Sequence, residues 1–198
     1  MSNGDGAPAG VGFVRDYALS QAQAAAAWDA PAQAVAETFP RRMATAESPN
    51  LASGVLTCTA LPLPHDTAIS AVTLFTGHVG GTAVSHGWVC VLDHTAMIIA
   101  ASEDQGTYGW PASTTISLDM IEPITTTVGG IYYLGVSITA SSVMPNFVST
   151  APMLNAVTAL PPLLTGTSTT GLGSMKEPGT QMATVTSPTG WAIYGIIT

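Results

Sequence analysis

Charged residues are scarce in this sequence. Asp, Glu, Lys and Arg make up 8% of the 198 residues, whereas a typical soluble domain has about 25%. Intrinsic disorder does not explain the deficit, because disordered chains are poor in apolar residues and 46% of this chain is apolar. The polar surface must instead come from hydroxyl groups, and 27 threonines supply them. Threonine is β-branched and suits the exposed face of a strand, so the composition favours an all-β domain.

Basic residues are the rarest of the charged ones. Four Lys and Arg stand against twelve Asp and Glu, which gives a net charge of −8. So few cations cannot neutralise a row of phosphates, and no polybasic membrane-binding segment is present. The stretch from Pro123 to Met175 has no charge, but Gly135 and Pro145 interrupt it before the ~20 apolar residues of a spanning helix are reached. We therefore expect no nucleic-acid partner and no membrane insertion.

Residues and motifs that carry chemistry are also few. The two cysteines, Cys58 and Cys90, lie among apolar residues and are expected as buried thiols, although a disulfide between them stays open. The sequence has no CxxC, no glycine-rich phosphate loop, no GxSxG and no HExxH. Four histidines lie at expected loops or strand ends, without the spacing that builds a metal site. The sequence therefore predicts a non-enzymatic protein without a metal or cofactor. The histidines are His65, His78, His86 and His94.

The first fifty residues differ from the rest. Residues 13–38 are rich in Ala, Gln and Glu, which favours a helix over 13–28 and, after a kink at Pro31, a short helix over 30–38. Apolar positions recur with alternating spacings of four and three, the pattern of a heptad stripe. Helices this short need a partner surface, so residues 1–50 are predicted to form an arm for docking or oligomerisation. The predicted contact residues are Val14, Ala18, Gln21, Ala25, Trp28, Val35 and Phe39.

Residues 51–198 show short runs of alternating apolar residues separated by turn clusters. About eight such runs with long irregular connections predict an antiparallel, jelly-roll-like β-sandwich. In residues 84–93 both faces are apolar, which indicates a central strand or one with a covered outer face. The Gly/Ser/Thr-rich segment 165–178 is expected as an exposed loop. Strands are expected over residues 51–61, 68–75, 84–93, 97–101, 114–120, 132–139, 146–149, 181–186 and 191–197.

One turn offers a candidate ligand site. Glu103 and Asp104 are followed by Tyr108 and Trp110 in an expected loop, where Trp110 would be a stacking surface for a sugar or a neighbour of a bound cation. Paired carboxylates that hydrolyse a glycosidic bond flank a cleft ~5–10 Å wide, and adjacent residues do not. These residues therefore favour a loop that binds a sugar or a cation, and they do not support a glycosidase.

Five segments of the sequence, taken together, carry a resemblance to known proteins: Asp16–Trp28, Glu37–Met43, Leu51–Thr57, Leu61–Pro64 and Gly130–Val136. They resemble the small β-sandwich virion proteins of tailed phages that infect actinobacteria, which serve as capsid decoration, head-fibre or minor tail proteins. The resemblance implies an N-terminal segment that docks to the particle, a sandwich that faces outward, often as a trimer, and assembly in the host cytoplasm. It brings no catalytic residue with it.

These observations lead to one main expectation and three alternatives. The main one is a capsid decoration or minor capsid protein of the virion, whose partners are other virion proteins and copies of itself. The first alternative is a tail or fibre protein that binds a host surface glycan. The second is a soluble carbohydrate-binding module, and the third is a hydrolase on a jelly-roll scaffold, for which no converging His and acidic side chains are expected.

Overall fold

The structure is a computed structural model that describes residues 34–106, 109–153, 163–169, 172–186 and 188–198. The chain divides into two units between Gln33 and Ala34. This boundary lies before the predicted one at residue 50. Residues 34–50 therefore belong with the sandwich. The predicted helix over 13–28 and the stripe from Val14 to Trp28 lie outside the described residues.

Eight strands of the second unit pair in nested fashion, as if one long hairpin had been rolled up. β1 pairs with β11, β3 with β8, β4 with β7 and β5 with β6, all antiparallel. This nesting is the jelly-roll arrangement, and it confirms the predicted fold class for the sandwich. The strands are β1 (Ala36–Glu37), β3 (Thr57–Leu63), β4 (Ala68–Phe75), β5 (Thr82–Leu92), β6 (Ile98–Ala101), β7 (Thr115–Thr125), β8 (Gly130–Val143) and β11 (Gly195–Ile197).

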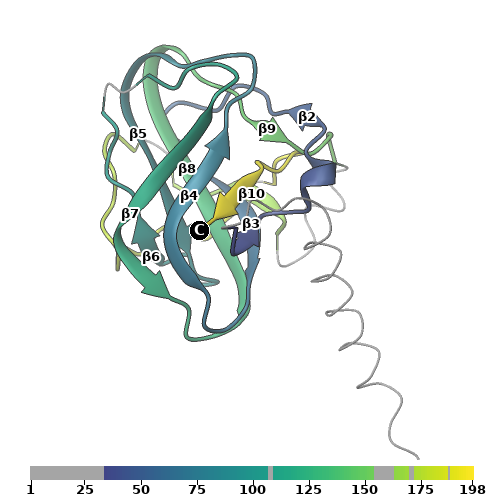
Figure 1. Cartoon of the computed structure of the whole chain (residues 1–198). Coiled ribbons are helices and arrows are strands. Elements are labelled where there is room, and N and C mark those ends of the chain that lie inside the picture. Colours follow the sequence, from purple (N-terminus) through teal and green to yellow (C-terminus); the bar gives the residue numbers. More distant parts are fainter. Residues whose placement is uncertain (1–33, 107–108, 154–162, 170–171, 187) are drawn as a thin grey trace, which may run out of the picture. The chain divides into compact units, whose positions relative to one another are not determined.

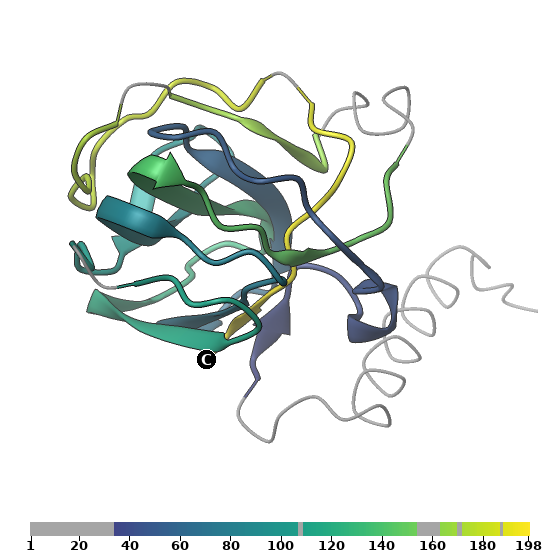
Figure 2. The same ribbon diagram turned by 90° about the horizontal axis from the view of Figure 1, so that it is seen from above.

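The rolled hairpin forms two packed layers: β4 and β7 lie in front of β5 and β8 in Figure 1, and Figure 2 shows the layers from above. One sheet has the order β1-β11-β4-β7, and the other has the order β10-β3-β8-β5-β6, where β10 is Thr165–Thr167. A small ladder joins β2 (Ala46–Glu47) to β9 (Val148–Ser149). A single 3-10 turn, η1 (Arg41–Met43), lies between β1 and β2.

The main core lies between the two sheets. In β7 the residues Ile116, Leu118 and Met120 are buried, and the residues between them are exposed. This strict alternation leaves the outer face of β7 polar, and there Thr73 of β4 donates a hydrogen bond to Ser117 (3.0 Å). The alternation in β7 therefore belongs to a sheet with one face on the core and the other face in solvent.

The other sheet is apolar on both faces, because a second core covers its outer side. Buried residues of β3, β5 and β8 pack there against Leu172, Met182 and Val185. We call residues 172–186 the strap; it runs along the outer side of this sheet in Figure 2. The predicted exposed loop over 165–178 is therefore wrong at Thr165, Gly166 and Leu172, which are buried, whereas Gly173, Ser174 and Glu177 are exposed. The sheet residues beneath are Leu56, Cys58, Ala60, Trp88, Cys90, Leu92, Ala101 and Tyr133.

The strap and the segment before it also cover the two edges of this sheet. β10 pairs with β3 along one edge, and Thr165 in it is fully buried. At the other edge, Gly179 donates to the carbonyl of Ile98 (2.7 Å), and Ile98 donates to the carbonyl of Thr180 (3.0 Å). Both edges thus find backbone partners, which reduces the exposure of unpaired strand groups.

The short helix predicted over 30–38 is contradicted where the structure describes it. Ala36 and Glu37 form β1, which extends the four-stranded sheet by pairing with Ile197 and Ile196. Ala and Glu favour helices, but pairing with a buried strand overrides that weak preference. Phe39 follows β1 and packs against Tyr194, with ring centroids 5.4 Å apart.

Strand positions were otherwise predicted closely. The range 68–75 matches β4, and the expected strands at 84–93, 97–101, 114–120 and 132–139 overlap β5 to β8. The expected strand over 181–186 is reduced to isolated bridges at its two ends, Gln181 with Met97 and Thr186 with Thr167. The two bridges thus lie at the ends of residues 181–186, the last part of the strap.

Candidate functional site

The predicted ligand loop is held to β5 by Asp104. Its carboxylate oxygen Oδ1 accepts the backbone N–H groups of Gly87 (3.0 Å) and Gly106 (2.9 Å), and Oδ2 lies 2.6 Å from Nδ1 of His86. Burial alone would raise the pKa of Asp104, but these hydrogen bonds outweigh it and lower the pKa. Asp104 therefore uses its carboxylate to fix the loop.

The aromatic part of the predicted site is corrected. Trp110 is fully buried in the main core and packs edge-on against Phe147, with ring centroids 5.8 Å apart. Its indole covers Gly87, where a β-carbon would lie 2.4 Å from Nε1. A side chain in this position offers no stacking face to a sugar. Glu103 is exposed, and Tyr108 lies outside the described residues.

Three of the four histidines place Nδ1 against a carboxylate. Besides His86, these are His65 beside Asp66 (2.7 Å) and His78 beside Glu47. His94 follows Asp93, whose carboxylate accepts the backbone N–H groups of the turn that follows it. Burial opposes this effect, but the hydrogen bonds lower the pKa of Asp93. Asp93 therefore uses its carboxylate to fix this turn.

The most connected polar cluster was missed by the sequence reasoning. Glu47 of β2 accepts hydrogen bonds from His78 and from the Asn146 side chain (2.8 Å). The contacts with His78, first of all through its side chain, lower the pKa of Glu47. Oδ1 of Asn146 in turn accepts the Val79 N–H (2.9 Å). Glu47 and Asn146 are 99 positions apart, so no local pattern in the sequence could indicate this contact.

The Glu47 cluster closes around Gly77. A β-carbon at this glycine would lie 2.6 Å from Oδ1 of Asn146 and 2.7 Å from Cδ of Glu47. The Gly77 N–H also donates to the backbone carbonyl of Asn146 (2.9 Å). Only a residue without a side chain allows this approach, so the cluster binds the β4–β5 loop to the β8–β9 connection.

The two cysteines are free, buried thiols in the structure. Cys58 of β3 and Cys90 of β5 pair with the same residue of β8, Gly135, from opposite sides. Strands lie about 4.8 Å apart, so two strand spacings separate the two backbones by more than the roughly 7 Å that a disulfide can bridge. Burial raises the pKa of Cys58 to about 12 and that of Cys90 well above its usual value.

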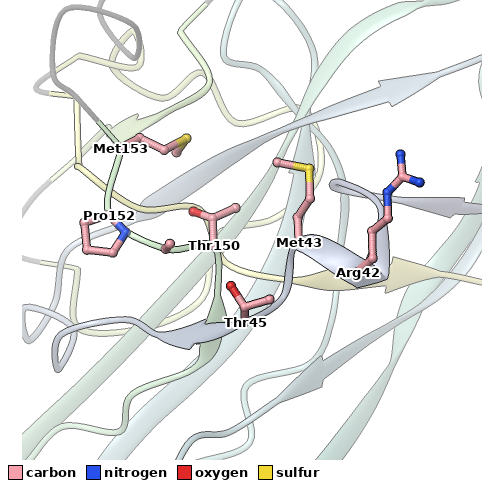
Figure 3. A pocket seen from close by; sticks show the side chains of 7 residues that line it. Arg42, Met43, Thr45, Thr150, Pro152 and Met153 are labelled. Atoms are coloured by element: carbon pink, nitrogen blue, oxygen red, sulfur yellow. The ribbon is translucent and has the colours of Figure 1, made fainter.

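An apolar hollow opens next to η1 (Figure 3). Its volume is about 310 Å³, and it lies where the chain that enters β2 and the chain that leaves β9 separate. Met43 and Met153 stand on its two sides, and Arg42 stands next to Met43, on the side away from Met153. We call this the η1 hollow. Its lining includes Arg42, Met43, Thr45, Thr150, Pro152 and Met153.

No family model matches the chain, and no curated protein matches it. A function can therefore be inferred only from the chain's own residues and their geometry. Within the described ranges, no three His, Cys, Asp or Glu side chains come together in a way that could hold a metal ion. The same part of the chain contains no helix of the length and apolarity needed to cross a membrane.

The described polar clusters share one type of chemistry. In Glu47, Asp93 and Asp104 a carboxylate oxygen accepts a hydrogen bond from a backbone N–H group. A carboxylate held in this way keeps its negative charge and stabilises the loop conformation. The arrangement fits a rigid scaffold, and among the described residues the η1 hollow presents an apolar surface.

Proposed function

We propose that this chain is a structural protein of a phage particle, a capsid decoration or minor capsid protein without enzymatic activity. Its N-terminal segment would attach to the shell, and its jelly roll would be displayed on the surface. The observation that carries the proposal is the division of the chain between Gln33 and Ala34. The part of the heptad stripe from Val14 to Trp28 falls before this boundary, whereas Val35, Phe39 and the jelly roll fall after it.

The construction of the jelly roll supports this division of labour. The strap covers the outer face of one sheet, and the other sheet presents hydroxyl groups such as those of Thr73 and Ser117. The sandwich thus buries its own apolar faces, while the predicted helical stripe needs a partner surface. Jelly rolls occur in viral capsid proteins and also in lectins and cupins, so the fold agrees with the proposal by analogy alone.

A tail or fibre protein that binds a host glycan is the alternative within the same class. Its best candidate was the loop with Trp110, whose aromatic face is now buried in the core. The remaining exposed member, Glu103, has no neighbouring aromatic platform among the described residues of the loop. The decoration role is therefore the better supported of the two, and partners and location follow from it: other virion proteins, further copies of the chain, and the virion.

The test compares the full chain with residues 34–198 in binding to particles that lack the protein. We expect the full chain to co-sediment with the particles and the shortened chain to remain in the supernatant. Trp28→Ala in the full chain should weaken attachment by about tenfold or more, because buried aromatic anchors dominate such contacts. Val128→Ala, at an exposed residue of the sandwich, is the control. Equal attachment by residues 34–198 would refute docking through the N-terminal segment.

A further inference from the structure

The η1 hollow is a preformed surface feature. Thr45 and Thr150 stand opposite each other, because Ala46 of β2 pairs with Ser149 of β9. Thr150 is itself fixed, since its N–H donates to the carbonyl of Ala192 (3.0 Å) and its Oγ1 accepts the Ala192 N–H (3.1 Å). Thr150 thus anchors one wall of the hollow directly beside the β2–β9 ladder.

The size and lining of the hollow suit an apolar side chain. Its volume of about 310 Å³ lies at the lower end of ligand pockets, which begin near 300 Å³. Met43 is 48% exposed on one wall, and Met153 and Pro152 form the other. Methionine adapts its shape to different partners and is common at surfaces that bind varied peptides.

The positive charge of Arg42 at the rim of the η1 hollow favours apolar partners that also carry a negative charge. Arg42 is one of only four Lys and Arg residues in a chain with a net charge of −8. It is exposed, and within the described residues it forms no ion pair. Met and Arg are enriched in protein interfaces, and a cation beside an apolar hollow favours a carboxylate beside an apolar side chain.

We propose that the η1 hollow binds a segment of another protein in which a leucine-sized apolar residue is next to an acidic residue. The apolar side chain enters between Met43 and Met153, and the carboxylate pairs with Arg42. A contact of this size is weak, with a dissociation constant on the order of 1 mM. It becomes effective when many copies act together on a repeating surface. The proposal does not depend on the virion role.

The test uses the full chain labelled with ¹³C at the methionine methyl groups, observed by NMR. The probes are acetyl-Gly-Leu-Leu-Asp-Asp-amide, its Asn-Asn counterpart and its Ser-Ser-Asp-Asp counterpart. We expect the first peptide to shift the methyl signals of Met43 and Met153 saturably and the Ser-Ser peptide to leave them unchanged. The Asn-Asn peptide should bind about two- to fivefold more weakly, as expected for an exposed ion pair.

Substitution of the arginine separates the two contributions. In Arg42→Gln the acidic and neutral leucine peptides should bind equally, because the substitution removes the ion pair that only the acidic peptide makes. The control, Lys176→Gln, removes a cation from the strap and should keep the preference for the acidic peptide. The proposal is overturned if the signals of Met43 and Met153 do not move in the wild type, or if the acidic preference survives in Arg42→Gln.

Discussion

Asp104 shows how single carboxylates organise this acidic protein. Its Oδ1 accepts two backbone N–H groups, and its Oδ2 faces Nδ1 of His86. Because the folded-state pKa of Asp104 is lowered, the stabilisation is present above the carboxyl's unfolded pKa of about 3.9. It is lost as the pH falls through the lower folded-state pKa, because the unfolded state then gains its proton first.

Asp104→Asn tests this contribution of charge. The amide oxygen can still accept both backbone N–H groups, but the negative charge opposite His86 is gone. We expect a loss of about 1 kcal/mol in the free energy of unfolding at pH 7, typical of a hydrogen bond to a charged group that is partly exposed. The difference from wild type should shrink as the pH falls below about 4. Urea unfolding followed by tryptophan fluorescence measures both quantities.

A second histidine–carboxylate pair provides the matched control for Asp104. Asp66 lies 2.7 Å from His65, but both side chains are mostly exposed. Asp66 has a φ of +60°, a conformation that asparagine tolerates. Asp66→Asn should therefore change the stability by less than about 0.5 kcal/mol at any pH. An equal effect of the two substitutions would show that the charge of Asp104 adds no more stability than the charge of an exposed pair does.

At the scale of residues, the sequence indicates which residues could form a site, but it shows few of the contacts that they make. The loop with Glu103 and Asp104 was identified, but as a surface site, because Gly109 and Pro111 around Trp110 are typical of an exposed turn. The indole instead fills the space over Gly87, which lies far away in the sequence. A pattern of nearest neighbours does not show that a glycine in one strand makes room for a ring from a later loop.

At the scale of elements, the strap is the unusual part of the fold. It has few regular backbone pairs, but its Leu172, Met182 and Val185 cover the outer face of β3, β5 and β8. Segments with little regular pairing open more readily than core strands. The two fully buried thiols, Cys58 and Cys90, lie beneath it and report such opening.

Thiol labelling under native conditions tests the strap. A buried thiol with a raised pKa reacts only when it is exposed, so the labelling rate measures the population of open states. Leu172→Ala removes apolar contact at the start of the strap and should destabilise its closed state by about 2 kcal/mol. We expect labelling by a disulfide reagent to become roughly 30-fold faster.

The control places the same substitution in the main core. Leu118 of β7 is 5% exposed, as is Leu172, but it packs between the two sheets. Leu118→Ala should lower the global stability measured in urea while changing the native labelling rate much less than Leu172→Ala does. If labelling in both variants simply follows global stability, the strap does not open as a separate unit.

The strap also marks the limit of prediction for elements. Alternation located β4 and β7 because one face of each meets solvent. The apolar character of both faces of β5 indicated a cover, which the second core confirms. The covering segment could not be named, since its apolar residues follow neither the helical nor the strand period. Helix preference likewise failed for Ala36 and Glu37, which are strand residues because β11 lies beside them.

At the scale of the whole molecule, the nested pairing makes the first strand of the jelly roll depend on the last. Val35 donates to the carbonyl of Ile197 (2.8 Å), and Thr38 donates to the carbonyl of Gly195 (3.0 Å). The Gly195 N–H returns a hydrogen bond to Oγ1 of Thr38 (3.0 Å), which is buried. Residues 34–50 are thus part of the sandwich, and the boundary between the two units lies before them.

Two shortened chains distinguish the boundary at residue 33 from the one at residue 50. Residues 34–198 keep β1, β2 and the contact of Phe39 with Tyr194, so they should unfold cooperatively in urea. Residues 51–198 lose these contacts and Glu47, which leaves the buried Gly195 N–H without its Thr38 partner. We expect a free energy of unfolding lower by roughly 3 kcal/mol or more. Equal stability of the two chains would return residues 34–50 to the arm and would move the division of the molecule to residue 50.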